Sequence, residues 1–102
     1  MSATPELQNI VGGVPTATID GRRSEVIDPS TGQAYTTAPI SSAADVDAAV
    51  KAAAAAFPGW RDTTPAERQL ALLRLADAVE ARAEEFVAAE SRNTGKPLTL
   101  TA

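Results

Sequence analysis

Hydrophobic and polar positions follow two different patterns along the chain. Up to about residue 40, short β-prone runs alternate with turn formers. Residues 7–11 and 14–19 flank Gly12-Gly13, which predicts a β-hairpin. Residues 25–28 and 34–37 flank Pro29-Ser30-Thr31-Gly32, where proline sets φ and glycine accepts a positive φ, so a second hairpin is expected.

From residue 42 onward the spacing becomes helical. Ser42 is an N-cap candidate with Asp45 at the third helical position, and an apolar face with a spacing of three and four residues follows it. Pro58-Gly59 is expected to end this first helix. The face contains Val46, Val50, Ala53 and Phe57.

A second helix is predicted to begin at Thr64. Thr64, Pro65 and Glu67 combine a capping box with proline at the first helical position. Its pattern runs on without a breaker into residues 83–92. One uncapped helix of about thirty residues is unusual, so two helices with a break near residues 80–82 are expected. Gly95 and Pro97 then stop the third helix.

This order predicts two segments: residues 1–40 with two β-hairpins, and residues 41–102 as a helical segment with three helices that forms an incomplete domain. About half of the apolar residues are alanine, which buries little surface per residue. We therefore expect the 102 residues to be marginally stable alone and to form an incomplete layer of a larger α/β unit.

Composition excludes several classes of function. The net charge is −4, and basic residues are scattered, so no nucleic-acid-binding stripe is present. No apolar run is long enough to span a membrane, and residues 1–7 lack the pattern of a signal peptide. The absence of cysteine fits a reducing compartment, and a cytoplasmic location is the expectation.

The chain also lacks the residues of common catalytic chemistry. It has no cysteine for a thiolate nucleophile, no histidine for a general base and no G-x-G-x-x-G or Walker loop. Glu84 and Glu85 are adjacent on a helix and point in different directions, so they are surface charges and not an acid/base pair. No catalytic and no cofactor-binding residue is assigned in this chain.

Four blocks in order nevertheless resemble the start of the aldehyde dehydrogenase superfamily. They are residues 27–32 (IDPSTG, beside the family's "NP-x-T/N-G-E"), 45–60 ("DV-x-x-AV-x-A-A-x-x-AF-x-x-W"), 65–77 ("R-x-x-x-L-x-x-x-A-D") and 93–98 (NTGKPL, beside "D-T-G-K-P"). Each block is weak alone, and their order and spacing make them specific together. Residues 93–101 most resemble the aminobutyraldehyde and betaine-aldehyde dehydrogenase branch.

The resemblance implies an α/β enzyme with a Rossmann-like NAD domain, which commonly forms homo-oligomers. It implies thiolate attack on an aldehyde, such as the amino-aldehyde 4-aminobutanal, then hydride transfer to NAD or NADP and hydrolysis of a thioester to the carboxylic acid. The thiolate, the base and the dinucleotide loop are not in this sequence, so the 102-residue chain alone is expected to be inactive.

The resemblance also implies a monovalent-cation site for K⁺ or Na⁺. In some members, backbone carbonyls after the hairpin and before "T-G-K-P" hold the ion, and these positions match Val26, Ile27 and Asn93. The family often has Asp at the last position, so Asn93 is expected to weaken the site. The alternative is that Val26 and Ile27 are only strand residues and Asn93 only ends a helix.

A non-catalytic helical module that binds a protein partner through its leucine stripe is the other reading of the chain. The two β-hairpins favour the enzyme, because a helical binding module has no use for them.

Overall fold

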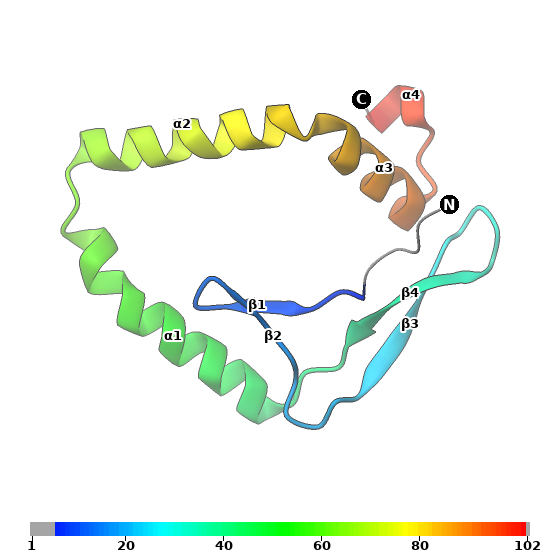
Figure 1. Cartoon of the computed structure of the whole chain (residues 1–102), viewed down its shortest axis with the longest axis horizontal. Coiled ribbons are helices and arrows are strands. Elements are labelled where there is room, and N and C mark those ends of the chain that lie inside the picture. The colour runs from blue at the N-terminus through cyan, green and yellow to red at the C-terminus, as the bar shows by residue number, and fades with distance from the viewer. Residues whose placement is uncertain (1–5, 102) are drawn as a thin grey trace. The chain divides into compact units, whose positions relative to one another are not determined.

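The structure is a computed structural model that describes residues 6–101. It forms two compact units, one of residues 1–27 and 34–61 and the other of residues 28–33 and 62–102. The sequence predicted no signal peptide at residues 1–7, and most of these residues lie outside the part of the chain that the structure describes. The elements, drawn in Figure 1, are β1 (Asn9–Val11), β2 (Val14–Thr16), β3 (Arg23–Ile27), β4 (Ala34–Pro39), α1 (Ala43–Arg61), α2 (Pro65–Ala81), α3 (Ala83–Thr94) and α4 (Leu98–Thr101).

Both predicted hairpins are confirmed in the first unit. Strands β1 and β2 pair antiparallel around Gly12-Gly13, whose φ angles of 60° and 79° are those that glycine adopts without strain. Strands β3 and β4 pair antiparallel from Arg23↔Pro39 to Ile27↔Ala34. The register shifts between Val26 and Ile27, because β4 holds one extra residue there.

Helix α1 begins as predicted and ends later than predicted. Ser42 and Asp45 exchange hydrogen bonds at its start, including Ser42 N–H to Asp45 Oδ2 at 2.8 Å. The expected stop at Pro58-Gly59 is wrong, because the helix continues through both residues to Arg61. Proline within four residues of the end removes only one backbone hydrogen bond, and Gly59 keeps a negative φ and does not turn the chain out of the helix.

In the second unit, the start of α2 and the break after it agree with the sequence. The Thr64 side chain accepts from the Glu67 N–H at 3.2 Å, and Glu67 Oε2 accepts from the Thr64 N–H at 2.7 Å. Arg82 separates α2 from α3, and Gly95 ends α3 with φ 75°. After Pro97, the chain forms the single helical turn α4, which the sequence pattern did not predict.

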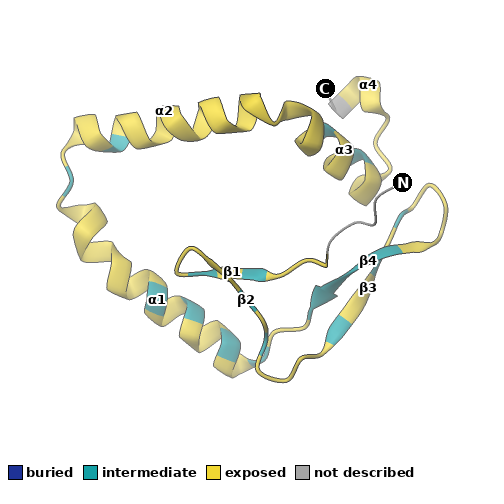
Figure 2. Cartoon of the chain, viewed as in Figure 1, coloured by how far each residue is buried: buried dark blue, intermediate teal, exposed yellow. Residues whose placement is uncertain are grey.

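No described residue is buried. Figure 2 shows only exposed and intermediate residues, and the intermediate ones are most concentrated on β4, where five of six residues are intermediate. Eighteen large hydrophobic residues are exposed, from Ile40 at 38% to Ile19 at 71% of their surface. Each unit therefore lacks a hydrophobic core of its own. Within residues 6–101, no helix combines the length and apolarity needed to cross a membrane.

Candidate functional site

The two strand residues of the predicted cation site lie next to a rigid turn. Val26 is half-buried, and Ile27 ends β3 beside the register shift. The turn that follows is closed by hydrogen bonds to Asp28. Its carbonyl accepts from the N–H of Thr31 at 3.2 Å and of Gly32 at 2.8 Å, and its Oδ1 accepts from the Ser30 N–H at 2.8 Å. The backbone after Ile27 is therefore held in one conformation.

The third residue of the predicted cation site, Asn93, lies in the last turn of α3. Hydrogen bonds cap this end of the helix. The Gly95 N–H donates to the Ser91 carbonyl at 2.9 Å, and Ser91 Oγ donates to the Lys96 carbonyl at 2.7 Å. Within the second unit, a Cβ added to Gly95 would lie 3.0 Å from Pro29 Cγ. Val26 and Ile27 belong to the first unit and Asn93 to the second, so the complete site stays a prediction.

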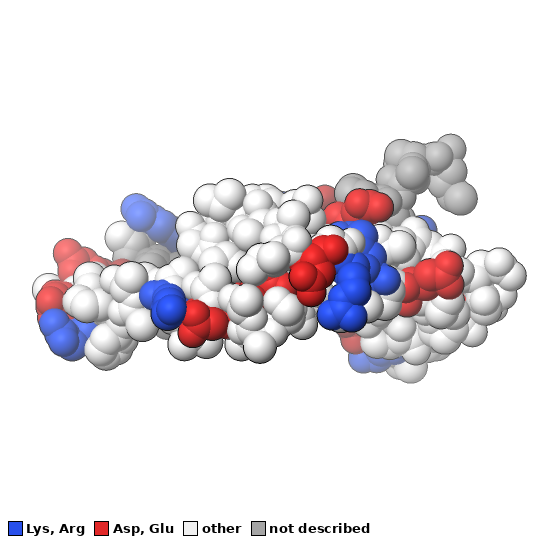
Figure 3. All heavy atoms as spheres, turned by 90° about the horizontal axis from the view of Figure 1, so that it is seen from below, with Lys and Arg blue, Asp and Glu red and all other residues white. Residues whose placement is uncertain are grey.

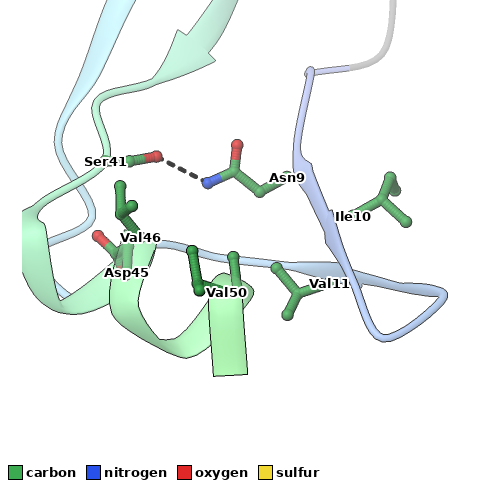
Figure 4. Close-up of a pocket in the computed structure, with 8 residues that line it drawn as sticks. Asn9, Ile10, Val11, Ser41, Asp45, Val46 and Val50 are labelled. Atoms are coloured by element: carbon green, nitrogen blue, oxygen red, sulfur yellow. Dashed lines mark hydrogen bonds between the residues drawn. The ribbon is translucent and has the colours of Figure 1, made fainter. Parts of the chain in front are cut away.

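A groove in the first unit lies between β1 and the start of α1. Figure 4 shows Asn9, Ile10 and Val11 on one side, and Ser41, Asp45, Val46 and Val50 on the other. The groove has a volume of about 310 Å³, and Asn9 Nδ2 donates to Ser41 Oγ across it at 2.8 Å. Its walls are mainly aliphatic, and it holds one carboxylate but no second acid or base to pair with it. The groove can accept apolar atoms but offers no chemistry.

Asp45, the one carboxylate in this groove, is committed to hydrogen bonds. It accepts from the Ser42 N–H at 2.8 Å, from the Ile19 N–H at 2.9 Å and from Ser42 Oγ at 2.9 Å. The backbone N–H groups of Ser42 and then of Ile19 lower the pKa of Asp45, because they stabilise the charged form. Asp45 thus joins the segment after β2 to the start of α1 and is a structural residue.

Other charged groups behave as surface residues. Figure 3 shows acidic side chains beside basic ones. Ion pairs between exposed side chains include Lys51–Asp47, at 2.8 Å, and Arg82–Glu85. The hydrogen bond from Arg82 lowers the pKa of Glu85 and raises the pKa of Arg82. Within the described part of the chain, no three His, Cys, Asp or Glu side chains are grouped as a metal site. Glu84 and Glu85 show no arrangement as an acid/base pair.

Sequence reasoning missed one residue that organises the first unit. Arg23 Nε donates to Thr37 Oγ1 at 2.6 Å, and its Nη2 donates to the carbonyls of Thr37 and Leu7. The Leu7 N–H in turn donates to the Thr37 carbonyl at 3.2 Å. Arg23 therefore ties the segment before β1 to β4. The sequence signal was only a basic pair, Arg22-Arg23, which does not indicate the partners.

Comparison with known proteins identifies the family. The family model described as "Aldehyde dehydrogenase family" matches residues 16–102. The chain is 47% identical over 96 residues to the 2-aminomuconic semialdehyde dehydrogenase of Danio rerio, covering 92% of this chain and 19% of that protein. It is 42% identical over 98 residues to the fluoroacetaldehyde dehydrogenase of Streptantibioticus cattleyicolor, covering 96% and 19%.

Solved structures agree with this match. The chain superposes with a TM-score of 0.91 on PnpE in complex with nicotinamide adenine dinucleotide, at 38% identity, covering 95% of this chain and 20% of that one. The succinate-semialdehyde dehydrogenase of Burkholderia pseudomallei gives a TM-score of 0.88 at 36% identity, covering 92% and 20%. The chain thus spans about a fifth of the relatives it matches and has the fold of the corresponding part of these α/β enzymes. From its residues, its hairpins and helices, and these matches, the chain belongs to the aldehyde dehydrogenase family.

Proposed function

We propose that this chain is the N-terminal part of an NAD-dependent aldehyde dehydrogenase that oxidises an amino-aldehyde, such as 4-aminobutanal, to a carboxylic acid. The observation that carries the proposal is the match to the family model over residues 16–102, together with relatives about five times as long as this chain. The amino-aldehyde class is supported by the NTGKPL segment at residues 93–98 and by relatives named for 2-aminomuconic semialdehyde. Other relatives are named for vanillin and fluoroacetaldehyde.

NAD supplies the hydride acceptor when it is bound. No residue of this chain is assigned to hold it, because the chain contains no dinucleotide-binding loop, and the starts of α1 and α2 are filled by their own caps. No step of the oxidation is carried by residues 6–101. Their contribution is to form the first hairpins and helices of the enzyme. We also propose that the complete enzyme is a homo-oligomer in the cytoplasm. Within this chain, the proposed boundary between the hairpin segment and the helical segment lies after residue 40.

The decisive experiment begins with the DNA downstream of the codon for Ala102. The coding sequence that contains residues 1–102 is expressed in full, and NADH formation is followed with 4-aminobutanal, 2-aminomuconic semialdehyde and vanillin. We expect turnover with the amino-aldehydes to exceed turnover with vanillin, and none from the 102-residue chain. A stop codon after Ala102 in several independent isolates would favour the protein-binding module. Preference for vanillin would overturn the amino-aldehyde class alone.

We also propose that the carbonyls of Val26, Ile27 and Asn93 hold a K⁺ or Na⁺ ion in the complete enzyme. The register shift between Val26 and Ile27 interrupts the regular ladder at that point, and the capped end of α3 holds the Asn93 backbone. Carbonyl oxygens are suitable ligands for hard cations whatever the side chain. Titration of the thermal midpoint of the complete enzyme with KCl and NaCl, against choline chloride at equal ionic strength, is the test. An identical response to all three salts would contradict the site.

A further inference from the structure

The junction between α2 and α3 is a break in a stretch of chain that contains no helix-breaking residue. Arg82 alone separates the two helices, with φ −118° and ψ 26°, and Figure 1 shows that α3 turns away from α2 at their junction. Residues 80–85 read EARAEE, and all three residue types favour the interior of a helix. Sharp kinks are usually found at proline, at glycine or at an inserted group. Local helix propensity therefore does not explain this break.

The backbone of Arg82 ends one helix and begins the next. Its N–H donates to the carbonyls of Glu80 and Val79, the latter at 3.1 Å, and both lie nearer along the chain than the fourth residue back that a continuous α-helix uses. Its carbonyl accepts from the N–H groups of Glu85 at 3.1 Å and Phe86 at 3.3 Å. Packing within the described residues does not impose this change, because neither helix has a buried residue.

The charges around the junction favour two helices over one. Because α3 begins at Ala83, Glu84 and Glu85 lie in its first turn, where the partial positive charge of the helix end stabilises carboxylates. In one continuous helix they would lose this stabilisation, and Glu80 and Glu84 would form a like-charged pair four residues apart. The side chain of Arg82 donates from Nε and Nη2 to the carboxylate of Glu85 and holds it at the start of α3.

We propose that the negative charge of Glu84 and Glu85 keeps α2 and α3 as two helices, and that neutralising this charge joins them into one helix over residues 65–94. The end of α3 would then move within the second unit. In the broken form this end meets the turn at Pro29, since a Cβ added to Gly95 would lie 3.0 Å from Pro29 Cγ. The charges at the junction therefore determine where the end of α3 lies, whatever the activity of the complete enzyme.

Spin labels can measure the bend, because the chain has no cysteine of its own. Ala71→Cys in α2 and Ala89→Cys in α3 replace two exposed residues. A continuous helix would place these positions on one face, with about 27 Å between their Cα atoms. In the 102-residue chain with Glu84→Gln and Glu85→Gln, we expect the interlabel distance, measured by double electron–electron resonance, to shift to that of a straight helix. The ¹³C chemical shifts of Arg82 should become helical in the same variant.

A matched control removes the same amount of charge away from the junction. It carries Asp77→Asn in α2 and Glu90→Gln in α3. It should keep the interlabel distance and the Arg82 chemical shifts of the unmodified chain. Arg82→Gly, added to the glutamine pair, should restore the break, because glycine disfavours a helix interior.

Several results would overturn the proposal. An unmodified chain that already gives the straight-helix distance is one, and an unchanged distance in the glutamine pair is another. An equal shift in the control would show that the effect follows net charge and not its position. Loss of helicity in the glutamine pair, measured by circular dichroism, would show that the two glutamates hold the helices themselves and not the break between them.

Discussion

At the scale of single residues, this chain is organised by a few polar groups whose partners lie far away in sequence. Asp45 joins the Ile19 N–H to the start of α1, Arg23 joins Leu7 to Thr37, and Asn9 joins Ser41. These bonds matter because the first unit has no buried core to hold its parts together.

Asp45→Asn should release the segment after β2 from α1. The carboxylate accepts three hydrogen bonds, and an amide offers one acceptor oxygen without the charge. We expect faster amide exchange at Ile19 and Ser42, measured by NMR, whereas Asp47→Asn, at an exposed ion pair, should leave both unchanged.

The pH dependence of this contact follows from the lowered pKa of Asp45. A carboxyl group with a pKa lower in the folded than in the unfolded state contributes stability above its unfolded pKa, and this contribution is lost as the pH falls through the folded pKa. The protection of Ile19 should therefore persist at neutral pH and fall only in acid below the usual range of aspartate. Loss of protection near pH 7 would contradict this assignment.

Gly95→Ala should destabilise the complete enzyme for two reasons. The left-handed φ of 75° costs a residue with a Cβ about 1–2 kcal/mol, and the new Cβ would lie 3.0 Å from Pro29 Cγ. Gly32→Ala is the matched control, because Gly32 has φ 71° and open space around it. Urea unfolding should show a larger loss for Gly95→Ala, and equal losses would mean that the Pro29 contact contributes nothing.

Asn93→Asp should strengthen the proposed cation site in the complete enzyme, because it restores a negative charge near the carbonyl ligands. We expect K⁺ or Na⁺ to raise the thermal midpoint at lower concentration than in the unmodified enzyme, by roughly several-fold for about 1 kcal/mol of added attraction. Asn93→Ser leaves the charge unchanged and is the control. A midpoint that responds equally to cations in both variants would argue against a cation at this position.

At the scale of elements, a few residues at the helix ends determine where each helix begins and stops. Thr64 and Glu67 form a reciprocal pair of hydrogen bonds, Pro65 begins α2, and Gly95 ends α3. The groups involved are within three or four residues of one another, so their partners are determined by local geometry.

Thr64→Ala should fray the first turn of α2. It removes the acceptor of the Glu67 N–H and typically costs about 1 kcal/mol, whereas Thr64→Ser keeps the hydroxyl. Amide exchange at Glu67 should rise in the alanine variant and not in the serine variant. Equal exchange in both would show that the cap does not hold this helix.

At the scale of the whole molecule, the dominant fact is that no described residue is buried. Burial supplies most of the free energy that offsets chain ordering, and here no described side chain is buried. The 102-residue chain should therefore melt over a broad range without a cooperative transition, as followed by circular dichroism and calorimetry. A sharp, concentration-independent transition of a monomer would contradict this expectation.

The sequence by itself determined the two hairpins, the caps at Ser42 and Thr64, the break near Arg82 and the stop at Gly95, because each depends on residues a few positions apart. It failed at Pro58-Gly59, where local helix breakers were tolerated inside α1. Only the tertiary structure decided the contacts of Arg23, Asp45 and Asn9 with distant residues and the approach of Pro29 to Gly95. Such partners are brought together by the path of the chain, which spacing along the sequence does not record.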